Sequence, residues 1–424
     1  MKNSGIEWIG NIPNDWNLIN VGSLFQCRNE KVSDKEYAPL SVSKGGVVPQ
    51  IDTVAKTDAG DNRKLVKKND FVINSRSDRK QSCGYSNLEG SVSLINTVLY
   101  VANENIILPQ YTTFLLKNYG FAEEFYRWGH GIVADLWTTR WQEMKSIVLP
   151  IPSIQKQTEI ILELDKKCAA VDRLIANQSN QIEKLKEYKQ SVITEAVTKG
   201  LNTSVPMKDS GIEWAEKIPT VWKVCRIKNL PDYSLANAFV DGDWIESPDI
   251  SDTGIRYLTT GNVGDGIFKR QGNGCITEET FNRLNCKYAY PGDLVMSRLN
   301  SPYGRSCILP YDEDKYVLAV DIVILRTKND KRYICYFTQC PSYQKLVEDF
   351  ARGTAMKRIS RNNLGNITIL LPPIDEQRQI ADYLDKRCEK IDKLIAIKQQ
   401  KIEKLNEYKK SLIYEYVTGK KEVI

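Results

Sequence analysis

Two stretches of the sequence place arginine beside small polar side chains, a combination that suits contact with nucleic acid. Each follows a short apolar run, at residues 70–74 and 293–297. Arginine can pair bidentately with guanine, asparagine and glutamine can pair with adenine, and serine can bind phosphate or base. A solvated loop held by salt bridges, for instance between Asp78 and Arg79, is the alternative that composition leaves open. The candidate contact residues are Asn74, Ser75, Arg76, Ser77, Arg79, Lys80, Ser297, Arg298, Asn300, Tyr303 and Arg305.

Glycines next to basic residues mark a second pair of clusters, at residues 128–141 and 352–363. Because glycine has no Cβ, the backbone there can approach a phosphate closely. A basic turn that caps a sheet is the alternative interpretation. Weaker candidates of the same kind lie in the loops at residues 41–46 and 259–262. Together these segments add Lys44, Arg140, Thr260, Asn262, Arg352, Lys357, Arg358 and Arg361 to the candidate DNA-binding residues.

Residue types that support catalysis or metal binding are scarce. The single histidine, His130, has no visible nucleophile as a partner, which disfavours a general base. The ten cysteines form no CxxC pair, so free thiols in a reducing compartment are a simpler interpretation than a zinc site. The sequence has no GxxxxGKS/T phosphate loop, and residues 371–374 lack the motif with which amino-methylating enzymes hold a flipped base. We therefore expect no catalytic residue, no metal and no cofactor.

The bulk composition is typical of a globular chain. Its 424 residues suffice for two or three domains, and a hydrophobic content of 42% disfavours disorder. No apolar run reaches about 18 residues, and the first residues lack the apolar core of a signal peptide. We therefore expect a cytoplasmic location and no membrane partner. A net charge of +6 is compatible with nucleic acid but does not by itself indicate it.

An internal repeat determines the organisation of the chain. The pattern SGIEW, followed by IP and W, occurs at residues 4–16 and again at 210–222. A longer repeat aligns residues 154–198 with 374–418 without a gap, and about half of its positions are identical. The residues between the repeats differ in length and sequence. The order is therefore variable domain, common segment, variable domain, common segment, with expected bounds of 1–150, 151–200, 201–371 and 372–424.

Both common segments are predicted to be long helices. Prolines precede each segment and none lies inside it. Apolar residues recur with the heptad spacing of a coiled coil. At 1.5 Å rise per residue, each helix would be roughly 65 Å long. We expect the two helices to pair antiparallel, and an ordinary amphipathic helix packed on its own domain is the alternative. Gln178 and Lys398 fall at matching seam positions, where they either fix the register or meet solvent.

The variable domains are predicted to mix strands and helices. Strand-like runs lie at residues 70–74 and 93–100 in the first domain, and at 293–297 and 317–325 in the second. Helical patterns follow these runs in both domains, near residues 111–128 and 333–351. The fold class is therefore α+β, with two α/β-mixed domains and an antiparallel coiled coil related by a pseudo-two-fold axis. Joining the chain ends would nearly recreate the internal junction, so we expect the termini to lie close together.

The chain resembles the specificity (S) subunit of type I restriction–modification systems over nearly its whole length. The duplicated pattern GIEW, IP and W carries this resemblance, at residues 5–16 and 211–222. A second element is the proline, glutamine and isoleucine pattern that opens each repeated helix. A third is the strand and loop GDLVMSR at residues 292–298, of which residues 70–76 are a looser form preceded by Asn69.

The resemblance implies a non-catalytic subunit that confers DNA-sequence specificity. Each variable domain would be a target-recognition domain that reads one half of a split, asymmetric site in double-stranded DNA. The half-site centres would lie about one helical turn, ~34–36 Å, apart. The helices would position the domains and bind two methylation (M) subunits, which transfer methyl groups, and restriction (R) subunits would add ATP-driven cleavage. The alternatives are a coiled-coil scaffold with two protein-binding heads and a self-sufficient methyltransferase or nuclease.

Overall fold

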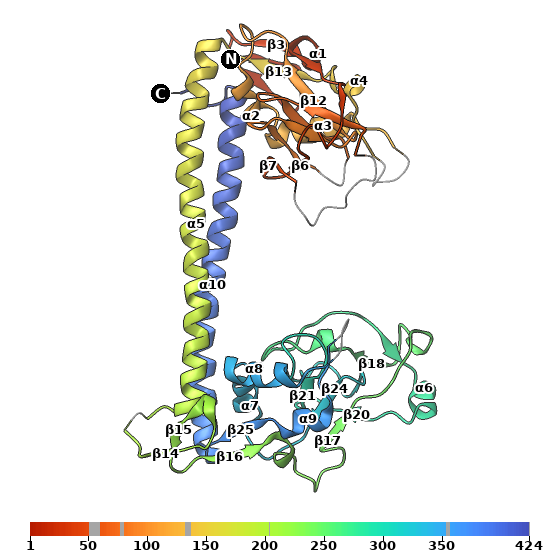
Figure 1. Cartoon of the computed structure of the whole chain (residues 1–424), viewed down its shortest axis with the longest axis vertical. Helices are drawn as coiled ribbons and strands as arrows, with labels where there is room; N and C mark the ends of the chain where they lie inside the picture. The colour runs from red at the N-terminus through yellow and green to blue at the C-terminus, as the bar shows by residue number, and fades with distance from the viewer. Residues whose placement is uncertain (51–59, 77–79, 132–136, 203, 353–356, 424) are drawn as a thin grey trace. The chain divides into compact units, whose positions relative to one another are not determined.

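Two long helices form where the repeated segments were predicted. In the computed structural model, α5 spans Ile154–Lys199 and α10 spans Ile374–Val417. Each helix begins at an isoleucine close behind a proline: Ser153 separates Pro152 from Ile154, and Ile374 follows Pro373 directly. Proline is tolerated only at a helix start, so the helices cannot extend further back. The two helices pack together (Figure 1). The structure describes residues 1–50, 60–76, 80–131, 137–202, 204–352 and 357–423.

The chain divides into two units, and each is described by itself. The first unit comprises residues 1–179 and 399–424, and the second comprises residues 180–398. Each unit thus holds one mixed helix-and-sheet domain and one end of the helix pair. Among the residues that the structure describes, no helix carries an apolar stretch that could span a lipid bilayer.

Ion pairs between α5 and α10 show that the helices run antiparallel. In the first unit Lys409 Nζ lies 2.7 Å from Asp172 Oδ2, and in the second unit Lys189 Nζ lies 2.7 Å from Asp392 Oδ2. The sequence repeat aligns Asp172 with Asp392 and Lys189 with Lys409. The same ion pair therefore forms in each unit with the roles of the helices exchanged, as a pseudo-two-fold relation requires. The predicted fold class is confirmed.

The predicted seam positions are buried or half-buried along the described helices. They include Leu164, Cys168 and Val171 in the first unit, and Leu384 and Cys388 in the second. Some apolar residues off the seam, such as Ile160 and Ile380, are buried as well, because they belong to the cores of the adjoining domains. Of the two polar seam residues, Gln178 is buried in the first unit. In the second unit Lys398 donates to Gln181 across the seam, so the lysine has a partner that favours one register.

The first domain contains a central antiparallel sheet in the order β10-β9-β12-β4. A three-stranded sheet, β11-β8-β5, and the hairpin β6-β7 accompany it, and β13 pairs with β3. The strands are β1 (Lys2–Asn3), β2 (Asn11–Ile12), β3 (Asn17–Asn20), β4 (Phe25–Cys27), β5 (Lys31–Val32), β6 (Leu40–Ser43), β7 (Gly46–Pro49), β8 (Arg63–Val66), β9 (Phe71–Asn74), β10 (Cys83–Tyr85), β11 (Gly90–Val92), β12 (Asn96–Val101) and β13 (Val148–Ile151). The helices are α1 (Val21–Leu24), α2 (Thr112–Leu115), α3 (Tyr119–Arg127) and α4 (Trp141–Met144).

The second domain contains the corresponding sheet, in the order β17-β24-β21-β22, and a second four-stranded sheet, β19-β18-β23-β20. Two further antiparallel pairs, β14-β15 and β16-β25, complete it. The strands are β14 (Met207–Asp209), β15 (Lys217–Pro219), β16 (Lys223–Arg226), β17 (Phe239–Asp241), β18 (Ile255–Leu258), β19 (Cys275–Ile276), β20 (Tyr288–Ala289), β21 (Leu294–Ser297), β22 (Ser306–Ile308), β23 (Tyr316–Leu318), β24 (Ile322–Leu325) and β25 (Thr368–Leu371). The helices are α6 (Glu278–Arg283), α7 (Lys331–Thr338), α8 (Pro341–Phe350) and α9 (Arg361–Asn366).

Two predicted elements of the second domain are divided in the structure. The strand predicted at residues 317–325 is two strands, β23 and β24, which belong to different sheets. The helical pattern at residues 333–351 is also two helices, α7 and α8. The second break lies at Pro341, which has no N–H for a continuing helix but is favourable in the first turn of a new one.

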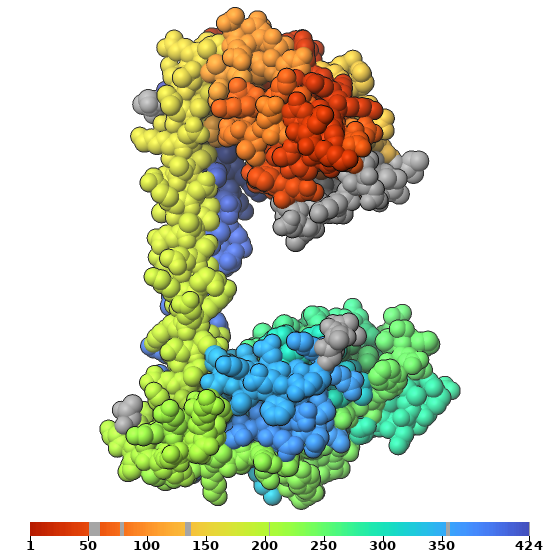
Figure 2. Space-filling model, in the orientation of Figure 1, coloured from red at the N-terminus to blue at the C-terminus, as the bar shows by residue number. Residues whose placement is uncertain are grey.

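The core of each domain continues into the adjoining end of the helix pair. In the first unit Cys168 of α5 and Tyr416 of α10 belong to the same buried cluster as Trp16. In the second unit Val197 of α5 and Cys388 of α10 belong to a cluster with Trp222 and Tyr333. The space-filling view shows each domain in direct contact with α5 (Figure 2). The helices are therefore part of both hydrophobic cores, as well as partners of each other.

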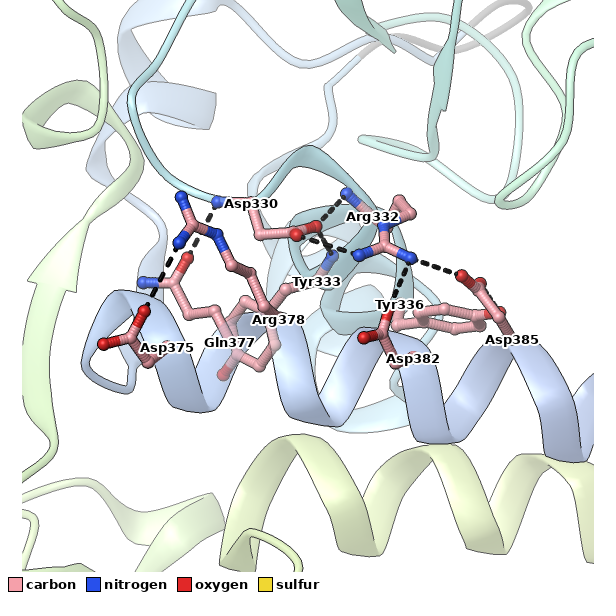
Figure 3. A network of polar contacts seen from close by, with 9 residues as sticks. All are labelled: Asp330, Arg332, Tyr333, Tyr336, Asp375, Gln377, Arg378, Asp382 and Asp385. Carbon is pink, nitrogen blue, oxygen red and sulfur yellow. Dashed lines mark hydrogen bonds and ion pairs between the residues drawn. The ribbon is translucent and has the colours of Figure 1, made fainter.

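A buried glutamine in the first turn of each long helix joins that helix to its domain. Gln157 Oε1 accepts from Leu108 N at 2.8 Å, and its Nε2 donates to Pro152 O at 3.0 Å. Gln377 repeats this geometry: its Oε1 accepts from Asp330 N at 3.0 Å (Figure 3). Its Nε2 donates to Pro372 O at 2.8 Å. Each amide therefore pairs with a backbone N–H of its domain and with a backbone carbonyl of the segment that leads into the helix.

Charged residues strengthen the second of these junctions. Arg332 of α7 reaches down to two carboxylates on α10, Asp382 at 2.8 Å and Asp385 at 2.7 Å. Tyr336 Oη donates to the same Asp385 at 2.7 Å (Figure 3). Because the partners lie one turn apart on α10, they fix both the position and the rotation of α7 on that helix.

Replacing Gln377 with alanine should destabilise the fold. The change leaves the buried Asp330 N–H and Pro372 carbonyl without a partner, which costs about 1–3 kcal/mol per group. Chemical denaturation measures the loss, and Gln157→Ala should show a similar one. Gln400→Ala, at an exposed position of α10, is the control and should leave the free energy of unfolding unchanged. Equal stabilities for all three variants would contradict the role assigned to the two buried glutamines.

The two chain ends meet in the first unit, which confirms the expectation from the repeat. Tyr414 Oη near the end of α10 donates to Trp8 O at 2.7 Å. A Cβ placed on Gly419 would lie 2.3 Å from Pro13 Cδ and 3.3 Å from Trp16 Cζ2. At the internal junction, a Cβ on Gly200 would lie 3.3 Å from Trp222 Cζ2. Trp16 and Trp222, which are equivalent positions of the repeat, thus pack alike against the glycines that follow α10 and α5.

The two junction glycines allow a matched comparison. Both have positive φ, +68° for Gly419 and +80° for Gly200, where an alanine costs roughly 1–2 kcal/mol. Gly419→Ala should be the more destabilising because its Cβ would also collide with Pro13. Thermal unfolding of the two variants beside wild type measures the difference. If Gly200→Ala proved the worse of the two, the packing described for Gly419 would be wrong.

Candidate nucleic-acid interface

In each domain the structure brings together the two clusters that the sequence singled out. In the first, Thr139 N donates to Ser75 O at 3.1 Å, and Arg76 and Thr138 form a β-bridge. We call the two segments, residues 74–76 and 137–140, the first loop pair. The strand β9 leads into one segment and α4 follows the other, so the central sheet and the approach to α5 position both.

The second domain repeats this construction. Ile359 N donates to Arg298 O at 3.0 Å, and Leu299 and Arg358 form a β-bridge. We call residues 297–300 and 357–361 the second loop pair. It follows β21, the strand that occupies the place of β9 in its sheet. Two domains of dissimilar sequence therefore present the same pair of backbone segments at the same place.

The first loop pair directs two arginines outward. Arg76 and Arg140 are exposed, whereas Ser75 is buried and its Oγ lies 3.0 Å from Thr97 Oγ1. Asn74 Oδ1 accepts from Arg76 N at 3.1 Å, so this side chain shapes the turn. The predicted contacts Ser77 and Arg79 lie outside the described residues. The predictions divide here into residues that can reach a ligand and residues that order the loop.

Two further predicted contacts of the first domain have different surroundings. Lys80 pairs with Glu123 at 2.7 Å and its Nζ lies 4.8 Å from the centre of the Tyr126 ring. This lysine is therefore partly neutralised. Lys44 lies at the exposed tip of the hairpin β6-β7. We find no described contact that joins Lys44 to the first loop pair.

A small cavity of about 20 Å³ lies beside the first loop pair. Phe121 and Phe125 contribute to its walls, and Tyr126 and Trp137 stand at its edge with ring centres 5.9 Å apart. Burial raises the pKa of the lining Cys83 thiol to about 12, so this thiol is unreactive. The volume admits about one water molecule or one methyl group. The sequence reasoning missed Tyr126 and Trp137, whose only signal was an aromatic residue within a basic cluster.

In the second loop pair, Arg298 is buried rather than exposed. Its side chain is 4% exposed and its Nε lies 3.0 Å from Asp241 Oδ1. Its Nη2 lies 3.3 Å from Asp321 Oδ1 and donates to Val320 O, and its Nη1 donates to Ile359 O. The sequence reasoning expected a side chain that faces DNA. The structure instead gives Arg298 the role of holding the loop, and a base contact by it stays a prediction without geometric support.

Arg305 is also buried, and it too holds loop backbone in place. Its guanidinium donates to five backbone carbonyls, those of Thr260, Val263, Leu299, Asn300 and Pro302. Burial lowers the pKa of this guanidinium, although arginine stays charged in a protein at neutral pH. Each of its three nitrogens has at least one backbone acceptor, so Arg305 ties the 259–262 loop to the second loop pair.

Several smaller predicted contacts also have structural roles. Asn262 is buried and its Nδ2 donates to the carbonyls of Lys269 and Gln271, at 3.0 and 2.8 Å. Ser297 and Tyr303 are buried too, and Thr260 is half-buried. The exposed candidates of this domain are Asn300, Arg352, Lys357 and Arg358, with Arg361 half-exposed. The exposed charge of this site therefore comes mainly from the segment before α10.

The described residues contain no group of three or more histidine, cysteine, aspartate or glutamate side chains that could hold a metal ion. His130 is exposed, and its backbone pairs with Thr138 in the first loop pair. The arrangement at both loop pairs offers cationic donors and amide groups on ordered backbone, which suits binding of a polyanion more than bond making or breaking.

Comparison with known proteins agrees with this geometry. Residues 221–407 match the family described as the type I restriction modification DNA specificity domain. The chain is 26% identical over 283 residues to the MjaVIII specificity subunit of Methanocaldococcus jannaschii, covering 65% of the chain and 62% of that relative. It is 20% identical to the EcoDI specificity subunit of Escherichia coli, covering 88% of the chain and 81% of that relative. The resemblance to type I specificity subunits is confirmed.

The fold agrees as well. A solved chain from work on complex assembly and conformational transition of the type I R-M system matches with a TM-score of 0.68. The match covers 96% of this chain and 98% of that chain at 14% identity, which shows a common fold. The specificity-domain match at residues 221–407 contains the second loop pair and most of α10. The first loop pair lies outside that match. It resembles the second loop pair in its backbone hydrogen bonds and β-bridge.

The buried role of Arg298 leads to a test of stability. Arg298→Ala removes the buried cation beside Asp241 and Asp321 and leaves the carbonyls of Ile359 and Val320 without their donor, which should cost about 3–5 kcal/mol. Arg352→Ala, at an exposed arginine nearby, should change the free energy of unfolding by no more than about 0.5 kcal/mol. Urea denaturation of both variants measures these losses. An Arg298→Ala variant as stable as wild type would refute the holding role.

Proposed function

We propose that this chain is the DNA-specificity subunit of a type I restriction–modification complex. Each domain, at residues 1–150 and 201–371, would be a target-recognition domain that reads one half of a split, asymmetric site in double-stranded DNA. The observation that carries this proposal is the duplicated loop pair. The same backbone construction presents exposed arginines in two domains whose sequences differ, which suits two readers of different half-sites.

The exposed side chains suggest how such reading would divide. Arginines and lysines that face solvent would contact phosphates and position the duplex, a contribution that weakens as salt rises. Asn300, Arg76 and Arg358 are placed on ordered loop backbone, where a side chain can meet a base edge. Buried members such as Arg298 and Asn262 would act by fixing the loops that carry these contacts.

The helix pair, at residues 151–200 and 372–424, would bind two methylation subunits. Leu174 of α5 and Leu394 of α10 are equivalent positions of the repeat and are 48% and 47% exposed. Exposed apolar side chains on a helix surface favour burial against a partner. Equivalent positions would present similar groups to two identical subunits. Methyl transfer would then occur in those subunits and cleavage in restriction subunits.

A scaffold with two protein-binding heads is the less favoured function. It would not require cationic side chains at both loop pairs. A self-sufficient methyltransferase or nuclease is also disfavoured, because the site offers binding groups without a reacting one.

Modular reading can be tested with a single arginine. Arg76→Ala should weaken discrimination at one half of the methylated motif and leave the other half unchanged, because only one domain carries the change. Sequencing of methylated DNA from cells that express the variant complex gives the motif directly. Lys68→Ala, at an exposed lysine just before β9 and at the opposite end of that strand from the first loop pair, is the control and should leave both halves unchanged. Loss at both halves for Arg76→Ala would refute modular reading.

A further inference from the structure

Two aspartates in the second domain each contact one buried and one more exposed arginine. Asp321 Oδ1 lies 3.3 Å from Arg298 Nη2 and 3.6 Å from Arg358 Nη1. Asp241 Oδ1 lies 3.0 Å from Arg298 Nε, and its Oδ2 lies 3.5 Å from Arg361 Nη1. The second loop pair thus contains a network of three cations and two anions, which we call the aspartate bridge.

The carboxylates of the aspartate bridge are fixed, whereas two of its arginines are held more loosely. Asp241 ends β17 and Asp321 directly precedes β24, which are neighbouring strands of one sheet. Arg298 N also donates to Asp321 O at 2.8 Å. By contrast, the Arg358 and Arg361 side chains are 53% and 41% exposed. The nitrogen–oxygen distances are 3.6 Å from Arg358 to Asp321 and 3.5 Å from Arg361 to Asp241, longer than those of Arg298.

The contacts are ionic rather than well-aligned hydrogen bonds. Among the described side chains, Asp241 Oδ1 and Asp321 Oδ1 are buried without an aligned hydrogen-bond donor. Ion pairs that are partly exposed and this long contribute about 0–1 kcal/mol to stability. They therefore add little to the fold at Arg358 and Arg361, but they limit the directions in which the two long side chains can point.

We propose that Asp241 and Asp321 are specificity-determining positioning residues, which hold Arg358 and Arg361 in the orientation used to contact DNA. This inference rests on the proposed function. An arginine that lies beside a fixed carboxylate has fewer accessible rotamers, so less rotamer freedom is lost when a matching base is bound. The carboxylates also repel phosphates, so they disfavour the unspecific contacts that any duplex offers.

The first domain has no equivalent of this device among its described residues. There, Ser75 N donates to Ile95 O, as Arg298 N donates to Asp321 O. An isoleucine thus occupies the place of Asp321 and a serine the place of Arg298. The effect of the aspartate bridge should therefore be confined to the half-site that the second domain reads.

Charge-neutral variants of the full chain test the proposal, alone and with methylation subunits. Asp321→Asn should bind a mixed-sequence 30-bp duplex roughly threefold more tightly, because Arg358 is released and a negative charge is lost. Selection from a randomised duplex pool should show weaker base preference in one half of the motif. Asp232→Asn removes the same charge from a carboxylate paired with Lys328 and should change neither result.

A double-variant cycle separates positioning from a merely structural role. If Asp321 acts through Arg358, Asp321→Asn should have no effect on base preference in an Arg358→Ala background, where only the smaller effect of the lost charge on affinity remains. Asp241→Asn and Arg361→Ala form a second, independent cycle. Each asparagine variant keeps one aspartate beside Arg298, and thermal unfolding shows whether the fold is retained.

The outcomes distinguish the two proposals. Wild-type chain that binds no duplex in either state would overturn the proposed function. Wild type that binds DNA, with Asp321→Asn unchanged in affinity and base preference, would overturn only the aspartate bridge. A proportional loss of all DNA binding together with a lower unfolding temperature would also overturn it, in favour of a structural role. Tighter unspecific binding with weaker base preference, where the change in preference is abolished in the Arg358→Ala background, would establish it.

Discussion

The packing of the repeated helices against each other and into both domain cores is the constraint on which the rest of the structure depends. Cys168 and Cys388 illustrate it, because each lies at a seam position and also in the core of its domain. A residue buried in both cannot move on one side without opening the other. The buried glutamines at the helix starts add a polar lock at the same junctions. The position of each loop pair on its own helix end is therefore over-determined.

This constraint explains how two sites can share geometry without sharing side chains. The loop pairs are joined by backbone hydrogen bonds, from Thr139 to Ser75 and from Ile359 to Arg298. A backbone N–H donates whatever side chain its residue carries. Side chains that face outward can therefore differ between the domains while the segments that carry them stay in place.

The elements with a local signal could be predicted from the sequence, and those that depend on distant partners could not. The heptad and the flanking prolines give the long helices, since both signals lie within a few residues of each other. The strand predicted at residues 317–325 divides because tertiary pairing assigns its halves to separate sheets. Arg298 and Arg305 were assigned to the surface because composition favours it. Their partners, such as Asp241 and Val263, are distant in sequence, so burial could not be foreseen.

The buried arginine also distinguishes how the two domains build one loop. A buried ion pair gains Coulomb energy but loses hydration, so its net contribution to stability is small. In the first domain a serine–threonine contact, Ser75 with Thr97, occupies the corresponding place without burying charge. Stability alone therefore gives no reason for Arg298. What the ion pairs add is direction: the guanidinium requires carboxylates at defined positions, and these carboxylates in turn orient Arg358 and Arg361. The two domains differ in how tightly their loops restrict the cations they present, even though the backbone construction is the same.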